Sequence, residues 1–263
     1  NCTGFQYSVL DRKKRQIRLL KIHKPENAGG YYVRAQLSTF DLQSAPSYSA
    51  LSYTWGTQNA TRSISLNGGR FEVGHSLYQF LDEFQHGEKQ NEQRWLWTDQ
   101  ICIDHNSNAE RSHQAGMMST IYSQALETLV WLNNYCTPRT VREMVKRLYE
   151  HLYFTRMWII QELMLAKEIR VMLQGQLSVP WEELHELYKG LALSQLGTTN
   201  SSWVWVRVSL KECSMSLLEG IITFFDQECT DPCDGIYGLM GIVRNEEQIV
   251  IDYDKSIQQV LLD

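Results

Sequence analysis

The stretch Phe154-Thr-Arg-Met-Trp-Ile-Ile-Gln-Glu-Leu-Met-Leu-Ala166 has the pattern of an amphipathic helix at the border of a protein core. Its apolar residues recur at the spacing of one buried helical face, and these are Ile159, Leu163 and Ala166. The Thr155 hydroxyl is placed to cap the free N–H groups of a first turn, so we expect the helix to begin there. Trp158 and Glu162 are four residues apart and therefore share a neighbouring face at the edge of the apolar stripe.

Glu162 is the candidate functional residue of this helix. A carboxylate held beside an indole at the edge of a core is partly desolvated, which is how an active-site acid or nucleophile is usually made. Most glutamates in helices are solvated, however, and the helix taken alone favours that plainer role. The remainder of the chain is therefore needed to choose between the two.

Strand and helix patterns alternate from about residue 48 to residue 190. We predict an α/β fold in which four buried strands lie parallel in one sheet, near 49–54, 95–101, 128–132 and 169–173. Helices are expected on both faces of this sheet, because each parallel connection must cross over it. Such sheets bind ligands beyond the carboxyl ends of their strands.

Four candidate binding residues fall at strand ends of this kind, and these are Tyr53, Trp55, Gly56 and Asp99. The glycine lets backbone come close to a ligand. The Asp99 carboxylate interrupts an otherwise apolar run and must find hydrogen-bond donors there. We expect this group to face the start of the helix that carries Trp158 and Glu162.

The flanking segments extend one domain that covers residues 1–263. Residues 1–47 are predicted to form an N-terminal β arm, from short alternating runs at 7–10, 17–22 and 31–37. Within the α/β core at 48–190, Asn67-Gly68 is a hairpin signal and Ser107-x-x-Glu110 has the spacing of a capping box. Residues 191–263 have a mostly helical pattern. No internal repeat or low-complexity linker is evident.

The composition excludes several classes of function. A chain of 263 residues, 43% of them hydrophobic, has enough apolar material for a substantial core. A formal net charge of -5 and a pI near 5.8 argue against a nucleic-acid partner. No apolar run approaches the roughly 20 residues that would span a membrane. The expected location is the cytoplasm, where the six cysteines would remain reduced thiols.

Cysteine chemistry offers weak alternatives. Cys102-x-x-His105 and Cys229-x-x-x-Cys233 have no second ligand pair at zinc-like spacing, so we predict no metal site. A nucleophilic pair of Cys102 and His105 is disfavoured, because thiols among apolar strand residues remain protonated.

Several motifs occur in an order that resembles the fungal heterokaryon-incompatibility (HET) domain. They are Tyr48-Ser-Ala-Leu-Ser-Tyr-Thr-Trp-Gly56, Leu96-Trp-Thr-Asp-Gln-Ile-Cys-Ile103, Glu110-Arg111, Arg156-Met-Trp-Ile-Ile-Gln-Glu162 and Asp231-Pro-Cys-Asp-Gly-Ile-Tyr-Gly-Leu239. The chain departs from the family pattern at Asp104-His105, where Asn-Gln is usual. It also departs at Cys233 and Gly235, where basic residues are usual.

HET domains are similar in pattern to TIR domains, which have a flavodoxin-like sheet and in many cases cleave NAD. The resemblance therefore implies a TIR-like core in which Glu162 is the catalytic carboxylate and NAD is a substrate rather than a cofactor. It also implies self-association, and a regulatory partner or an attached sensor domain. The implied function is that of a cell-death effector in fungal self/non-self recognition.

Cleavage of the nicotinamide–ribose bond passes through an oxocarbenium-like state, which a nearby carboxylate stabilises. Glu162 would supply that charge, with Trp55 or Trp158 stacking on a ring. Asp99 either binds ribose hydroxyls or pairs internally with Arg111. Arg111 and Arg156 either bind a pyrophosphate or neutralise Asp99 and Glu162.

Two other functions remain open at this level. The first is a non-catalytic TIR-like module that acts by self-association and recruitment. The second is an enzyme that acts on another nucleotide in the same cleft. No P-loop or Gly-x-Gly-x-x-Gly motif is present, which disfavours a phosphate-cradling NTPase.

Overall fold

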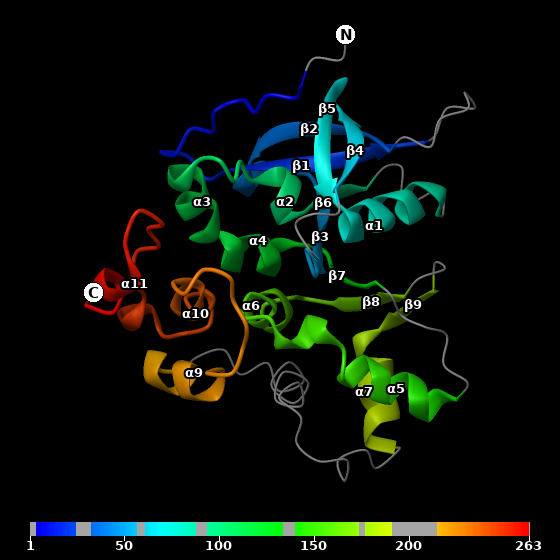
Figure 1. Cartoon of the computed structure of the whole chain (residues 1–263), viewed down its shortest axis with the longest axis vertical. Coiled ribbons are helices and arrows are strands. Elements are labelled where there is room, and N and C mark those ends of the chain that lie inside the picture. Colours follow the sequence, from blue (N-terminus) through cyan, green and yellow to red (C-terminus); the bar gives the residue numbers. More distant parts are fainter. Residues whose placement is uncertain are drawn as a thin grey trace.

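The structure is a computed structural model that describes residues 4–24, 33–56, 61–87, 94–133, 140–173, 177–190 and 215–262. Its centre is a mixed sheet, in which the described strands follow the order β5-β4-β2-β1-β6-β3-β7-β8-β9 (Figure 1). The strands are β1 Gln16–His23, β2 Arg34–Asp41, β3 Tyr48–Tyr53, β4 Thr61–Leu66, β5 Gly69–Gly74, β6 Trp95–Trp97, β7 Thr128–Leu132, β8 Ile169–Leu173 and β9 Leu177–Pro180.

The four predicted parallel strands are adjacent in this sheet. β3 pairs in parallel with β6 on one side and with β7 on the other, and β7 pairs in parallel with β8. Every residue of β3 and β7 is buried, as expected for strands covered on both faces. The prediction of a parallel α/β core is therefore confirmed, with β3 at its centre.

Antiparallel strands extend this core at both edges. β1 pairs with β6 over only two residues and with β2 over eight, and β9 pairs with β8. The β4–β5 hairpin turns at Asn67 and Gly68, with positive φ angles of 48° and 80°, as the Asn-Gly signal predicted. The sheet is thus mixed rather than purely parallel, because the arm covers the edge that the short strand β6 would otherwise leave open.

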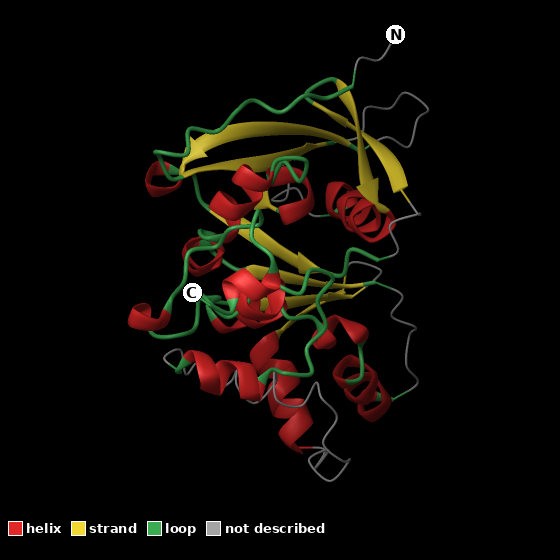
Figure 2. Cartoon of the chain, turned by 60° about the vertical axis from the view of Figure 1, so that its left-hand side comes forward, coloured by secondary structure: helices red, strands yellow, loops and turns green. Residues whose placement is uncertain are grey.

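Helices lie on both sides of the parallel strands (Figure 2). The described α-helices are α1 His75–His86, α2 Asp99–Cys102, α3 Asn108–Ala115, α4 Met118–Gln124, α5 Val141–Tyr149, α6 Ile159–Met164, α7 Trp181–Gly190, α9 Leu217–Thr223, α10 Asp234–Tyr237 and α11 Ile257–Val260. Leu129 and Trp131 of β7 pack into the hydrophobic cluster that contains α1, α2 and α4. Val130 and Leu132 pack into the cluster that contains α6 and α7. This alternation places β7 between two helical layers.

Several predicted boundaries are wrong. The strand predicted over 95–101 stops at Trp97, because the backbone turns into α2, where the Cys102 N–H donates to the Thr98 carbonyl at 2.8 Å. Residues 7–10 form no strand. Tyr7 instead lies against Arg18, whose guanidinium carbon is 4.7 Å from the ring centroid.

The central helix also begins later than predicted. Thr155 ends a 3-10 turn, Leu152–Thr155, and its hydroxyl donates back to the Leu152 carbonyl at 2.9 Å instead of capping a helix. Arg156 is extended and bridges to Glu228, so α6 starts only at Ile159. The predicted helical stripe is nevertheless buried as expected. Of the predicted C-terminal helical region, residues 191–214 lie outside the described residues, and 215–262 contain short helices joined by irregular segments.

A buried ion pair ties the β arm to the helical layer. Arg18 of β1 is 2% exposed, and its guanidinium holds both carboxylate oxygens of Glu110, at 2.5 and 3.0 Å. The arginine also donates to the Cys102 carbonyl, and Glu110 accepts from the Asp104 N–H. Ser107 caps α3 as predicted, but the reciprocal half of the capping box is absent because the Glu110 carboxylate is used by Arg18.

We predict that Glu110→Gln lowers the free energy of unfolding by about 3 kcal/mol or more, because it leaves the Arg18 charge buried without a partner. Urea denaturation of the two proteins measures this loss. The control is Glu72→Gln, which breaks the exposed pair with Arg70 and should change stability by less than about 1 kcal/mol. Equal effects of the two changes would contradict a structural role for the buried pair.

Candidate functional site

Glu162 lies in the middle of the molecule, between α6 and the central strand β3. All six residues of α6 are buried, and Glu162 is 3% exposed. Its carboxylate accepts a short hydrogen bond from the Ser52 hydroxyl of β3. The predicted desolvation of this carboxylate is therefore confirmed, and it is stronger than the sequence suggested.

The hydroxyl groups around Glu162 form a relay. Ser52 has one hydroxyl proton, and it is donated to Glu162. The Tyr153 hydroxyl, 2.5 Å from the Ser52 oxygen, must then donate to Ser52. Burial raises the pKa of Tyr153 well above its ordinary value, and the Glu162 charge adds to that rise, so the phenol retains its proton. The relay thus runs from Tyr153 through Ser52 to Glu162.

Burial raises the pKa of Glu162 from 4.5 to about 7. The Arg156 charge acts against this rise, the Asp99 charge adds to it, and the hydrogen bond from Ser52 lowers the pKa. The carboxyl group therefore titrates near neutral pH. Titration in this range is typical of groups at functional sites, although buried structural carboxyls share it.

Several predicted binding residues gather beyond the end of β3. The Trp55 indole N–H donates to the Asp99 carboxylate at 2.7 Å. The Trp55 and His105 rings pack edge-on, with their centroids 4.9 Å apart. Arg156 donates to the Tyr53 carbonyl at the same strand end. Of these residues Tyr53 is buried, whereas Trp55, Asp99, His105 and Arg156 are half-buried.

Gly56 completes this rim on the exposed side. Its φ of 75° lies in the left-handed region, where a side chain would be strained, and no atom of the described residues lies within 4 Å of the position that a Cβ would take. Glycine is therefore the residue that fits this backbone conformation after Trp55.

Arg111 and Trp158 belong to a second cluster. Arg111 lies 4.0 Å above the ring of Tyr253 and 3.9 Å from the Asp231 carboxylate. Of the two alternatives for Asp99, the internal pair with Arg111 is therefore the one that the structure does not form, because α3 directs Arg111 toward the C-terminal segment. Burial raises the pKa of Asp234, and hydrogen bonds from Tyr253 (2.6 Å) and Trp158 act against that rise. Trp158 packs against both hydrophobic clusters and so connects the two parts of the site.

Sequence reasoning missed the hydroxyl groups of Ser52 and Tyr153, and also that of Tyr122, whose hydrogen bond likewise lowers the Glu162 pKa. A signal for Ser52 was present, since a polar residue inside a fully buried strand must have a hydrogen-bond partner. Tyr122 and Tyr153 offered no comparable signal, because buried tyrosines are ordinary core residues. Asp234 and Tyr253 were missed because the C-terminal segment has no periodic pattern that would place it against α3.

Cysteine chemistry does not contribute here. Burial raises the pKa of Cys102 to about 12, so its thiol remains protonated. Within the described ranges, no group of three or more His, Cys, Asp or Glu side chains is arranged to hold a metal ion. None of the described helices is both long and apolar enough to cross a membrane.

The fold and site define an α/β protein with a buried carboxyl group, of pKa about 7, that is hydrogen-bonded to the central strand of its parallel core. Comparison with known proteins then shows a likeness to one family: residues 48–140 match the model of the heterokaryon incompatibility protein (HET) family. The chain is also 34% identical over 142 residues to "Heterokaryon incompatibility protein 6, OR allele" of Neurospora crassa. This alignment covers 50% of the chain but only 21% of that relative's length. No solved structure matches the chain.

We predict that the stability of the protein depends on pH through Glu162. Since the folded-state pKa is raised, the stabilising contribution is complete below pH 4.5 and is lost as pH rises to about 7. At about 1.4 kcal/mol per pKa unit, the loss is roughly 3 kcal/mol. The neutral amide of Glu162→Gln does not titrate. Between pH 5 and pH 8 the free energy of unfolding of the variant should therefore rise by roughly 3 kcal/mol relative to that of wild type, and its melting temperature should rise with it. Parallel pH profiles of wild type and variant would contradict the assignment.

Proposed function

We propose that this chain is the HET domain of an effector in fungal incompatibility and cell death, and that its Glu162 site hydrolyses NAD to nicotinamide and ADP-ribose. The family match and the printed name of the Neurospora crassa relative support the first part. A single observation carries the second part: Glu162 is a buried carboxyl group with a pKa near 7, next to a half-buried aromatic and charged rim.

The proposed chemistry needs one ionised carboxylate beside the ribose. The bond between ribose C1′ and the nicotinamide nitrogen breaks, nicotinamide leaves as a neutral base, and water adds to C1′ and releases one proton to solvent. Negative charge on Glu162 stabilises the oxocarbenium ion that develops meanwhile. The low-dielectric surroundings strengthen this interaction, because little water screens it.

The rim supplies the remaining binding groups. Trp55 offers a ring for stacking, and Asp99 offers a carboxylate that accepts from ribose hydroxyls. Arg156 offers a guanidinium for the pyrophosphate. In the described conformation Arg156 donates to the Tyr53 carbonyl instead, and Glu162 is closed off from solvent. Release of Arg156 by an anionic substrate, or by self-association of the domain, would open the way to Glu162.

A non-catalytic signalling module is the second candidate. The observation that favours it is that Glu162 is 3% exposed and already hydrogen-bonded, as a structural residue would be. In that case the same residues would hold β3 against α6, and the domain would act by association alone. Turnover assays on matched variants separate the two functions.

We expect Glu162→Gln to reduce nicotinamide release from NAD by about a hundredfold or more, because the variant retains side-chain volume but loses the charge that faces the oxocarbenium ion. Release is measured per folded molecule on the self-associated domain. The matched control is Glu127→Gln, which neutralises another buried carboxylate, held by Arg94 and Arg170 at the amino end of β7. That variant should lose stability but retain its turnover. An active Glu162→Gln, or a wild type without activity, would refute the enzymatic proposal.

The pH profile of turnover provides a second test. Because only the ionised Glu162 carboxylate stabilises the oxocarbenium ion, the rate of nicotinamide release should rise with pH through a midpoint of about 7. Ser52→Ala removes a hydrogen bond that lowers the Glu162 pKa, so the midpoint should move to higher pH. Ser49→Ala, which affects the Glu127 carboxylate 3.1 Å away, is the control and should leave the midpoint unchanged. An unshifted midpoint in Ser52→Ala would mean that another group titrates.

A further inference from the structure

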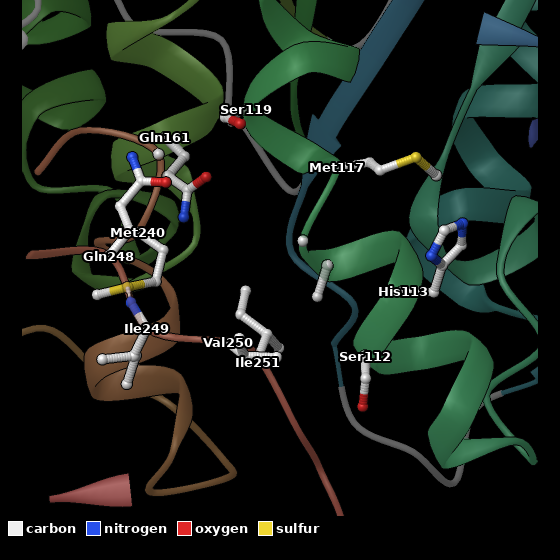
Figure 3. A pocket seen from close by; sticks show the side chains of 13 residues that line it. Ser112, His113, Met117, Ser119, Gln161, Met240, Gln248, Ile249, Val250 and Ile251 are labelled. Atoms are coloured by element: carbon white, nitrogen blue, oxygen red, sulfur yellow. Dashed lines mark hydrogen bonds between the residues drawn. The ribbon is translucent and has the colours of Figure 1, made fainter. Parts of the chain in front are cut away.

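A cavity of about 370 Å³ lies apart from the Glu162 site. Figure 3 shows Ser112, His113 and Met117 on one side of it and Gln161 and Met240 on the other. The cavity therefore separates α3 and the start of α4 from α6 and the C-terminal segment. Its volume falls within the range of roughly 300–1,000 Å³ that small-molecule sites occupy.

The described lining of the cavity contains no Asp, Glu, Lys or Arg side chain, and His113 is its one titratable group. A ligand with a full charge would lose its hydration there without gaining a carboxylate, ammonium or guanidinium partner. Ile249, Val250 and Ile251 supply hydrocarbon surface along one wall. The chemistry of the walls therefore selects an uncharged molecule with both polar and apolar surfaces.

The Gln161 amide provides a specific polar contact. Its Nε2 group donates to the Tyr237 carbonyl at 2.9 Å, which fixes the orientation of the amide and directs Oε1 toward Gly241. The half-buried Ser119 lines the same cavity. A Cβ at Gly241 would lie 2.4 Å from Gln161 Oε1 and 2.8 Å from Ser119 Cβ, so glycine is required there to preserve this space.

We propose that this cavity is a second binding site, which takes an uncharged heteroaromatic molecule such as a nucleobase or a nucleoside. A heteroaromatic ring carries its donors and acceptors on the edge and hydrocarbon-like surface on its faces. The edge meets Gln161 Oε1 and the Ser119 hydroxyl, and the faces pack between the aliphatic walls. Because Gln161 precedes Glu162 on α6, the bound molecule also contacts the helix that carries the carboxyl group.

The test is a binding titration, followed by ligand-observed NMR, with adenine, adenosine, nicotinamide and indole as probes. At least one of them should bind the wild-type domain, and AMP should bind more weakly than adenosine because the described lining has no Lys or Arg for its phosphate. Ser119→Leu fills the space beside Gln161 and should weaken the binding by about tenfold or more. Ser119→Ala, the matched comparison, removes the hydroxyl contact but leaves the space open, so it should weaken the binding less than Ser119→Leu does.

Val250→Trp provides a second blocking variant if Ser119→Leu does not fold. Val250 lines the cavity but is 79% exposed, so a larger side chain there avoids the packed core. Absence of binding by every probe overturns the proposal, as does binding that a folded blocking variant leaves unchanged. The latter result would place the probe at another site, including the one beside Glu162. The experiment involves no turnover, so its outcome is independent of the proposed NAD hydrolysis.

Discussion

The hydrogen bond between Ser52 and Glu162 is the interaction around which the structure is organised. It joins the central strand β3 to α6, and it lies where both elements are fully buried. A carboxyl group in such a place is tolerated only if its oxygens find donors or if it takes up a proton. Both conditions apply to Glu162, which accepts from Ser52 and has a pKa of about 7. The free-energy cost of burying this carboxyl group is the observation on which the proposed chemical role rests.

The buried ion pair of Arg18 and Glu110 stabilises another part of the fold, the junction between the β arm and the parallel core. β6 is only three residues long, so the parallel core would end in a short, open edge without the arm. Arg18 holds the arm in place through its hydrogen bonds to Glu110 on α3. Glu110 and Arg111 are neighbours in sequence, yet the first supports the fold and the second faces Asp231 and Tyr253. Adjacent motif residues can thus have unrelated tasks.

The parallel core was predictable because buried strands impose continuous apolar runs, and β3 and β7 follow that rule throughout. The Asn67-Gly68 turn was predictable because its positive φ angles restrict the residues that fit. The start of α6 was not, because Thr155 is compatible with both a cap and the 3-10 turn that it closes, and the tertiary contact with Glu228 decides between them. The pairing of Arg111 with Asp231 was also not predictable, since Asp231 lies more than a hundred residues away in an irregular segment.

The extent of the functional unit follows from these contacts. The family match covers residues 48–140, which include Ser52, Trp55 and Asp99 but not Glu162. Yet Glu162 reaches back into that segment through Ser52, and Arg156 does so through the Tyr53 carbonyl. The C-terminal segment continues the same arrangement, since Asp234 and Tyr253 join Arg111 on the other side of Trp158. The matched segment therefore supplies half of a site, and the residues that follow it supply the carboxyl group and the surroundings that set its pKa. Any activity of this domain must be a property of the whole arrangement, because neither half buries Glu162 alone.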